Sequence, residues 1–185
     1  MNPPVATLAD RMGVSIHQSP LQFKIRRWLE SSGEGMKLDP EDWLVELANR
    51  RGGTVVFRQQ ESPVGTRWPN RDEFQDEELV VALCQLNCVD RPQLLRLPAQ
   101  FISRGKLDIG VLIRLAKMER AARTLKELST QALKVEPTHP VWHRISEEFF
   151  DEKPFAEPLI HWSRLAEPLF AYGKANPIGW KLVAG

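Results

Sequence analysis

Apolar side chains recur at helical spacing along most of the chain. In residues 40–51, Trp43, Leu44, Leu47 and Ala48 share one face of a predicted helix. Comparable patterns predict further helices over residues 4–12, 20–31, 77–88, 91–105, 106–135, 138–150 and 157–172. The sequence therefore predicts a mostly α-helical protein, an array or bundle of short antiparallel helices.

Several of these helices carry a recognisable start. Ser19 and Asp39 each precede a proline, which combines an N-cap with the residue favoured at the first helical position. We expect Thr138 to cap the helix that follows it. Pro98 should kink or split the helix that contains it. The stretch over 106–135 is either one long helix or two helices that meet near Glu119.

One segment departs from the helical pattern. Residues 54–57, Thr-Val-Val-Phe, follow two glycines and are β-branched or aromatic, which predicts a strand. The next residues, 59–70, hold two prolines and a glycine, as a loop or hairpin tip would. We expect one short strand or hairpin near residues 54–68. The predicted organisation is a small helical subdomain over 1–75 and a helical array over 76–185.

Bulk properties narrow the class of protein. The chain has 185 residues and no apolar run near the ~18 residues of a membrane span. Two cysteines make no disulfide framework, and the first residues lack the apolar core of a secretory signal. These features predict a cytoplasmic protein with no membrane partner, and they leave its oligomeric state open.

Charge is sorted along the chain, although the net charge is only +1. Residues 91–144 carry eleven Lys and Arg against four Asp and Glu, a local excess of +7. Acidic clusters over 72–78 and 147–152 flank this basic segment. Such sorting suits an acidic protein surface or a nucleic-acid backbone as partner, or it pairs one part of the fold with another.

Within the basic segment, five cations recur every third residue: Arg114, Lys117, Arg120, Arg123 and Lys126. In one straight helix this series would sweep about 240° around the axis, so the five cannot share one face. They are the candidate partner-binding residues, with electrostatic steering and contact as their role. The alternative is a solvated face that pairs with the acidic flanks.

Element order in the first third resembles a winged helix, with three helices before a strand and a Pro/Gly loop. In that resemblance Arg50 and Arg51 would end the recognition helix, and Arg58 and Arg67 would flank the wing. The resemblance implies DNA binding. However, residues 1–75 hold ten basic and ten acidic side chains, whereas a domain that reads DNA grooves is usually basic.

Motifs for metal binding or catalysis are weak. His139, His143 and Glu147 are four residues apart, but His139 precedes a proline at a helix start, so a capping or surface role is favoured. Cys84 and Cys88 lie one turn apart in an apolar helix, so we expect them to be buried small side chains and not metal ligands. We therefore assign no metal, no cofactor and no catalytic residue.

Three functional hypotheses remain at this point. The first is a non-enzymatic macromolecule-binding or scaffold protein that engages an acidic partner through the basic segment, residues 91–144. The second is a winged-helix-like regulator that binds DNA. The third is a hydrolase whose residues are scattered in sequence, since neither a phosphate-binding glycine loop nor a Gly-x-Ser-x-Gly elbow occurs.

Overall fold

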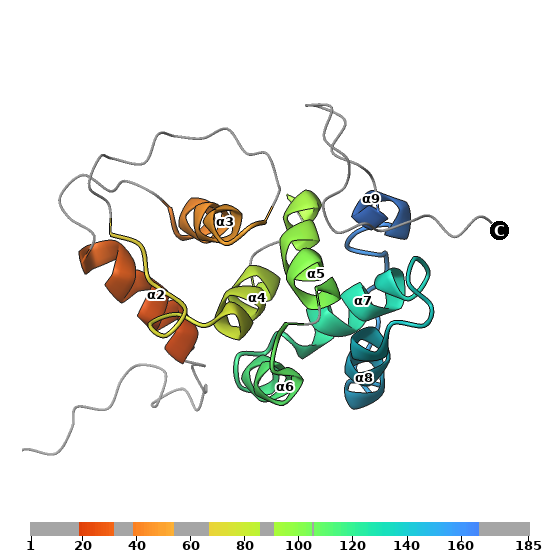
Figure 1. Ribbon diagram of the computed structural model, residues 1–185. Coiled ribbons are helices and arrows are strands. Elements are labelled where there is room, and N and C mark those ends of the chain that lie inside the picture. Colours follow the sequence, from red (N-terminus) through yellow and green to blue (C-terminus); the bar gives the residue numbers. More distant parts are fainter. Residues whose placement is uncertain (1–18, 32–38, 54–66, 86–90, 105, 167–185) are drawn as a thin grey trace, which may run out of the picture.

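Residues 19–31, 39–53, 67–85, 91–104 and 106–166 are described by the computed structural model. These residues are mostly helical, which confirms the predicted class (Figure 1). The elements are α2 (Pro20–Ser31), α3 (Pro40–Arg50), α4 (Asp76–Gln85), the 3₁₀ helix η1 (Pro92–Leu95), α5 (Arg96–Ser103), α6 (Ile109–Met118), α7 (Ala122–Ala132), α8 (Pro140–Glu148) and α9 (Trp162–Ala166).

Helix α4 forms the centre of the fold, between the α2–α3 pair and helices α5 to α8 (Figure 1). Six consecutive residues of α4, Leu79 to Cys84, are buried. A helix that is apolar on all sides belongs inside a core, and α4 contacts α2, α3, α5, α6 and α7. Buried side chains from α2 through α9 join one hydrophobic cluster. The predicted division at residue 75 stays a prediction.

Two of the three predicted caps are confirmed. Ser19 Oγ accepts a hydrogen bond from the Gln22 amide at 3.0 Å, and Asp39 Oδ1 accepts one from the Glu41 amide at 2.6 Å. The Thr138 prediction was wrong, because α8 begins at Pro140 with His139 at the N-cap position. A residue that precedes proline is driven to an extended backbone, so the helix cannot begin earlier.

The long stretch after residue 105 is two helices, as one of the two alternatives predicted. Helix α6 ends at Met118 and α7 begins at Ala122. The start of α6 was not predicted; there the Asp108 side chain accepts a hydrogen bond from the Val111 amide at 3.0 Å. The last predicted helix begins later than expected, because residues 157–161 are irregular and α9 begins at Trp162; residues 167–172 lie outside the described ranges.

Pro98 does not interrupt its helix. The chain changes from 3₁₀ to α geometry at Arg96, so Pro98 is the third residue of α5. A missing N–H costs little in the first turn, where amides have no acceptor within the helix. The predicted strand over 54–57 lies outside the described residues. Arg67 and Trp68, at the edge of the predicted hairpin, are in an irregular segment, and no strand occurs in the described ranges.

The end of α3 is fixed by close backbone packing. Gly52 has φ of +96°, a left-handed conformation that favours glycine. A Cβ on Gly53 would lie 2.8 Å from the backbone carbonyl oxygen of Ala48 and 2.7 Å from Leu97 Cδ2, so a side chain here would clash with the end of α3. Arg104, directly after α5, donates to the Gly52 carbonyl at 2.5 Å.

None of the helices in the described ranges has the length and apolar composition of a membrane span.

Candidate functional site

The five cations of the predicted site follow the α6–α7 corner. Arg114 and Lys117 lie on α6, Arg120 lies in the turn, and Arg123 and Lys126 lie on α7. Because the helix breaks after Met118, the five do not wrap a single helix. Their surroundings separate them into two groups.

Three of these cations contact α8 and the segment that follows it. Lys117 forms an ion pair with Glu148. Arg123 donates to the carbonyls of Lys153 and Pro154 at 2.9 and 2.8 Å, and its guanidinium lies 4.0 Å from the centre of the Phe155 ring. Lys126 donates to the Ser146 carbonyl at 2.8 Å. These three side chains therefore bind other parts of the same chain.

Arg114 and Arg120 are exposed, and neither makes an ion pair or hydrogen bond with another described residue through its side chain. Arg120 has φ of +58°, at the position after the C-cap of α6 where glycine is favoured. The Ala121 amide closes the turn on the Ala116 carbonyl at 2.9 Å. Arginine in this conformation costs about 1 kcal/mol relative to glycine.

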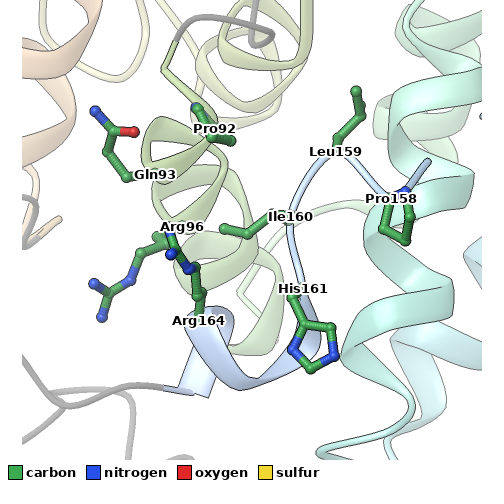
Figure 2. A pocket seen from close by; sticks show the side chains of 8 residues that line it. All are labelled: Pro92, Gln93, Arg96, Pro158, Leu159, Ile160, His161 and Arg164. Carbon is green, nitrogen blue, oxygen red and sulfur yellow. The ribbon is translucent and has the colours of Figure 1, made fainter.

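A pocket of about 240 Å³ lies where α9 returns to η1 and α5 (Figure 2). We call it the α5–α9 pocket. Its polar lining is Gln93, Arg96, His161 and Arg164, and its apolar lining is Pro92, Pro158, Leu159 and Ile160. Figure 2 shows the two arginines on one side, Pro158 and Leu159 on the other, and Ile160 between them.

Local packing fixes the side of the α5–α9 pocket that α9 provides. Ile160 and Leu165 are buried in the core, and they hold α9 and the irregular segment before it against the rest of the fold. Arg164, between them in sequence, remains exposed. On the opposite side, η1 begins at Pro92 and passes directly into α5, which carries Arg96 on its first turn.

His161 adds a hydrogen-bond donor to this lining. Its Nδ1 accepts from the Ser163 amide at 3.3 Å and lies 2.8 Å from Ser163 Oγ. In the neutral ring the proton is therefore on Nε2, which leaves Nε2 as a donor. Trp162 supports the ring at a centroid distance of 5.2 Å.

The chemistry of the α5–α9 pocket favours an anion that carries an apolar group. Arg164, His161 and Gln93 can each donate to a carboxylate, and no Asp or Glu is among the residues that line the pocket. The two prolines, Leu159 and Ile160 provide an apolar floor. Arg164 and His161 were missed by sequence reasoning, since more than sixty residues separate them from Arg96 and no local motif joins them.

Ser103, Glu136 and His139 are brought together elsewhere, at the junction of α5 and α8. Ser103 Oγ donates to Glu136 Oε2 at 2.9 Å, and Trp142 Nε1 donates to the same oxygen at 3.1 Å. The His139 ring faces the backbone carbonyl of Ser103 at 3.2 Å, not its hydroxyl. A serine nucleophile needs its hydroxyl bonded to the base, so this arrangement joins helices rather than activating an oxygen.

The histidines and cysteines that were weighed for metal binding, and not assigned to it, have local roles. His143 Nε2 lies 2.6 Å from the Pro137 carbonyl, which places its ring over the preceding turn. Cys84 is buried in α4, and Cys88 lies outside the described residues. In the ranges that the structure describes, no three His, Cys, Asp or Glu side chains are grouped to hold a metal ion.

Arginines of the winged-helix resemblance contact other side chains of the N-terminal third. Arg50 pairs with Glu46 at 2.9 Å and stacks over Trp68, and Arg67 pairs with Glu73. Arg51 is largely buried, and its pairing is with Asp76 at 2.9 Å. Arg58 lies outside the described residues.

No protein-family model matches the chain, and no curated protein sequence or solved structure matches it either.

Proposed function

We propose that this protein is a non-enzymatic binding protein that engages an acidic segment of a partner protein through its basic helical segment, residues 91–144. The observation that carries the proposal is the α5–α9 pocket. Arg96 belongs to the basic segment and lines this pocket together with Arg164 and His161, with no carboxylate among the lining side chains.

An acidic protein segment fits this pocket better than a nucleic-acid backbone does. Half of the lining is apolar, from Pro92, Pro158, Leu159 and Ile160. A phosphate backbone is recognised by cations along a groove and makes little use of an apolar floor. A peptide that alternates carboxylates with apolar side chains uses both parts of the lining. Arg114 and Arg120, which remain exposed, would add steering of the same sign.

Fluorescence polarisation with a labelled, capped hexapeptide of alternating Glu and Leu tests the proposal. We expect saturable binding at low salt that weakens as salt screens the charges. The same peptide with Gln in place of Glu should bind at least about tenfold more weakly, since each lost ion pair contributes up to about 1 kcal/mol. Equal affinity for the two peptides would contradict the proposal.

A pair of matched variants locates the binding. Arg164→Glu reverses a charge in the pocket and should reduce affinity for the acidic peptide about tenfold or more. Arg27→Glu makes the same change on exposed α2, which lies on the other side of the fold (Figure 1), and should leave affinity unchanged. If a DNA duplex binds at the same salt concentration and the acidic peptide does not, the partner is a nucleic acid and the proposal is wrong.

A further inference from the structure

The chain also carries a surface that matches the ligand expected for the α5–α9 pocket. Phe150, just after α8, is 78% exposed, the largest value among the exposed large hydrophobic side chains of the described ranges. Glu147 and Asp151 beside it are also exposed. We call these three residues the Phe150 surface.

Charges near the Phe150 surface are mostly acidic. The segment over 147–152 reads Glu-Glu-Phe-Phe-Asp-Glu, with four carboxylates in six residues. Lys117 neutralises Glu148, whereas the side chains of Glu147 and Asp151 make no ion pair with a described residue. Phe149 is buried in the core and fixes the direction of the segment, so its neighbour Phe150 is held outward.

The Phe150 surface and the α5–α9 pocket are complementary in both chemistry and size. The ring of Phe150 needs an apolar floor, and the flanking carboxylates need a cation such as Arg164 and a donor such as His161, which both line the pocket. A cavity of about 150 Å³ already holds benzene, and the pocket has about 240 Å³. Because Phe150 is mostly exposed, it does not occupy the pocket of its own chain.

From this complementarity we infer that the acidic partner is a second copy of the chain, whose Phe150 surface docks into the α5–α9 pocket. This inference rests on the proposed function. The contact joins two different surfaces, so it is heterologous, and each copy retains one unused pocket and one unused Phe150 surface. Copies therefore add head to tail, into a ring or an open chain. One aromatic side chain and a few ion pairs make a small interface, so the association is weak and depends on concentration.

Sedimentation velocity over about 10 to 500 µM protein at low salt measures the association. The weight-average mass of the wild type should rise with concentration and fall again when salt is added. Arg164→Glu, which reverses the charge in the pocket, and Phe150→Ala, which removes the ring, should each remain monomeric. Arg27→Glu and Phe23→Ala are matched controls on exposed positions of α2 and should associate as the wild type does.

Mixing the two variants that should not self-associate gives the sharpest test. The Arg164→Glu chain keeps its Phe150 surface and the Phe150→Ala chain keeps its pocket, so the mixture should form a one-to-one dimer and no larger species. A wild type that stays monomeric throughout, association that persists in Arg164→Glu, or a mixture that stays monomeric would overturn the inference.

A peptide titration separates this inference from the proposed function. The Phe150→Ala chain retains its pocket, so it should bind the Glu-Leu hexapeptide and a capped peptide of residues 147–152. Binding of the Glu-Leu hexapeptide without self-association of the wild type would overturn the inference and leave the proposed function standing. Failure of both peptides to bind would contradict the proposed function itself.

Discussion

The carboxylate of Glu119 accepts a hydrogen bond from the backbone amide of Leu21 at 2.9 Å, although 98 residues separate the two. Ser19 Oγ donates to the other oxygen of this carboxylate, and Gln85 Nε2 donates to it at 3.0 Å. Glu119 is only 3% exposed and satisfies donors from α2 and α4. The carboxylate also lies at the N-terminus of α2, where a negative charge interacts favourably with the positive end of the helix dipole. The corner between α6 and α7 is therefore tied to the start of α2.

Replacing Glu119 should destabilise the protein substantially. Glu119→Ala leaves the Leu21 amide and the Ser19 and Gln85 side chains without this buried acceptor, so we expect a loss of about 2–4 kcal/mol in the free energy of unfolding. Urea denaturation monitored by circular dichroism measures this loss. Glu147→Ala, at an exposed position, is the control and should change stability by less than about 0.5 kcal/mol. Equal effects of the two changes would show that the Glu119 hydrogen bonds do not contribute to the free energy of unfolding.

Local signals in the sequence were sufficient for the helix starts that depend on neighbouring residues. Ser19 and Asp39 stand directly before a proline, and the stop at Gly52 follows from the left-handed turn that only glycine adopts readily. Thr138 failed as a cap because proline at residue 140 restricts His139 and sets the helix start by itself. Short-range backbone rules thus explain both the confirmed and the wrong predictions.

The candidate site could not be predicted in the same way. The α5–α9 pocket joins Arg96 to His161 and Arg164, and the packing of α9 on η1 brings them together. Nothing near Arg123 in sequence indicates that it would bind carbonyls some thirty residues later. The count of charges shows that residues 91–144 are basic in composition. It does not show which of these cations bind other residues of the protein and which remain exposed.

Arg120→Gly should stabilise the protein. Arg120 has φ of +58° in the turn that ends α6, and glycine adopts this conformation without the Cβ strain. We expect a gain of about 0.5–1 kcal/mol, measured by thermal unfolding. Arg120→Ala removes the same charge but keeps the strain, and it should leave stability unchanged within about 0.5 kcal/mol. If Gly and Ala behave alike, the turn is not strained by its side chain.

Arg51→Lys should destabilise the segment that leads into α4. The Arg51 guanidinium pairs with Asp76 and also donates to the carbonyls of Pro69 and Asn70 at 3.1 and 3.0 Å. A lysine ammonium cannot reproduce this planar set of donors, so we expect a loss of about 1–3 kcal/mol in urea denaturation. Arg71→Lys is the control: it alters the exposed partner of Asp76 and should cost less than about 1 kcal/mol.

The pH dependence of the same site follows from the charge of Arg51. Burial lowers the pKa of its guanidinium, and the neighbouring Asp76 opposes that shift. A lowered pKa means that folding slightly disfavours the charged form at every pH below that pKa. Because arginine loses its proton only far above neutral pH, this contribution is constant between about pH 5 and 9. A change in wild-type stability across that window that disappears in Arg51→Lys would contradict this assignment.

Arg123→Ala and Arg114→Ala should separate the basic series into members used inside the fold and members left on its surface. Arg123 binds two carbonyls and stacks on Phe155, so its removal should release the segment after α8 and cost about 1–2 kcal/mol. Arg114 is exposed, and its removal should change stability by less than about 0.5 kcal/mol. Hydrogen exchange should locate the Arg123 effect at residues 150–156, because that is the segment its guanidinium holds.

Binding measurements on the same two variants complete this test. Arg114→Ala should lower the affinity for the acidic hexapeptide by about twofold, because a distant exposed charge acts only through steering. The effect should be larger at low salt than at high salt. Arg123→Ala should leave the affinity unchanged once the protein is folded, since its charge is already engaged. If Arg123→Ala instead weakened binding while stability stayed at the wild-type value, the contacts of Arg123 with the 153–155 segment would not be its main role.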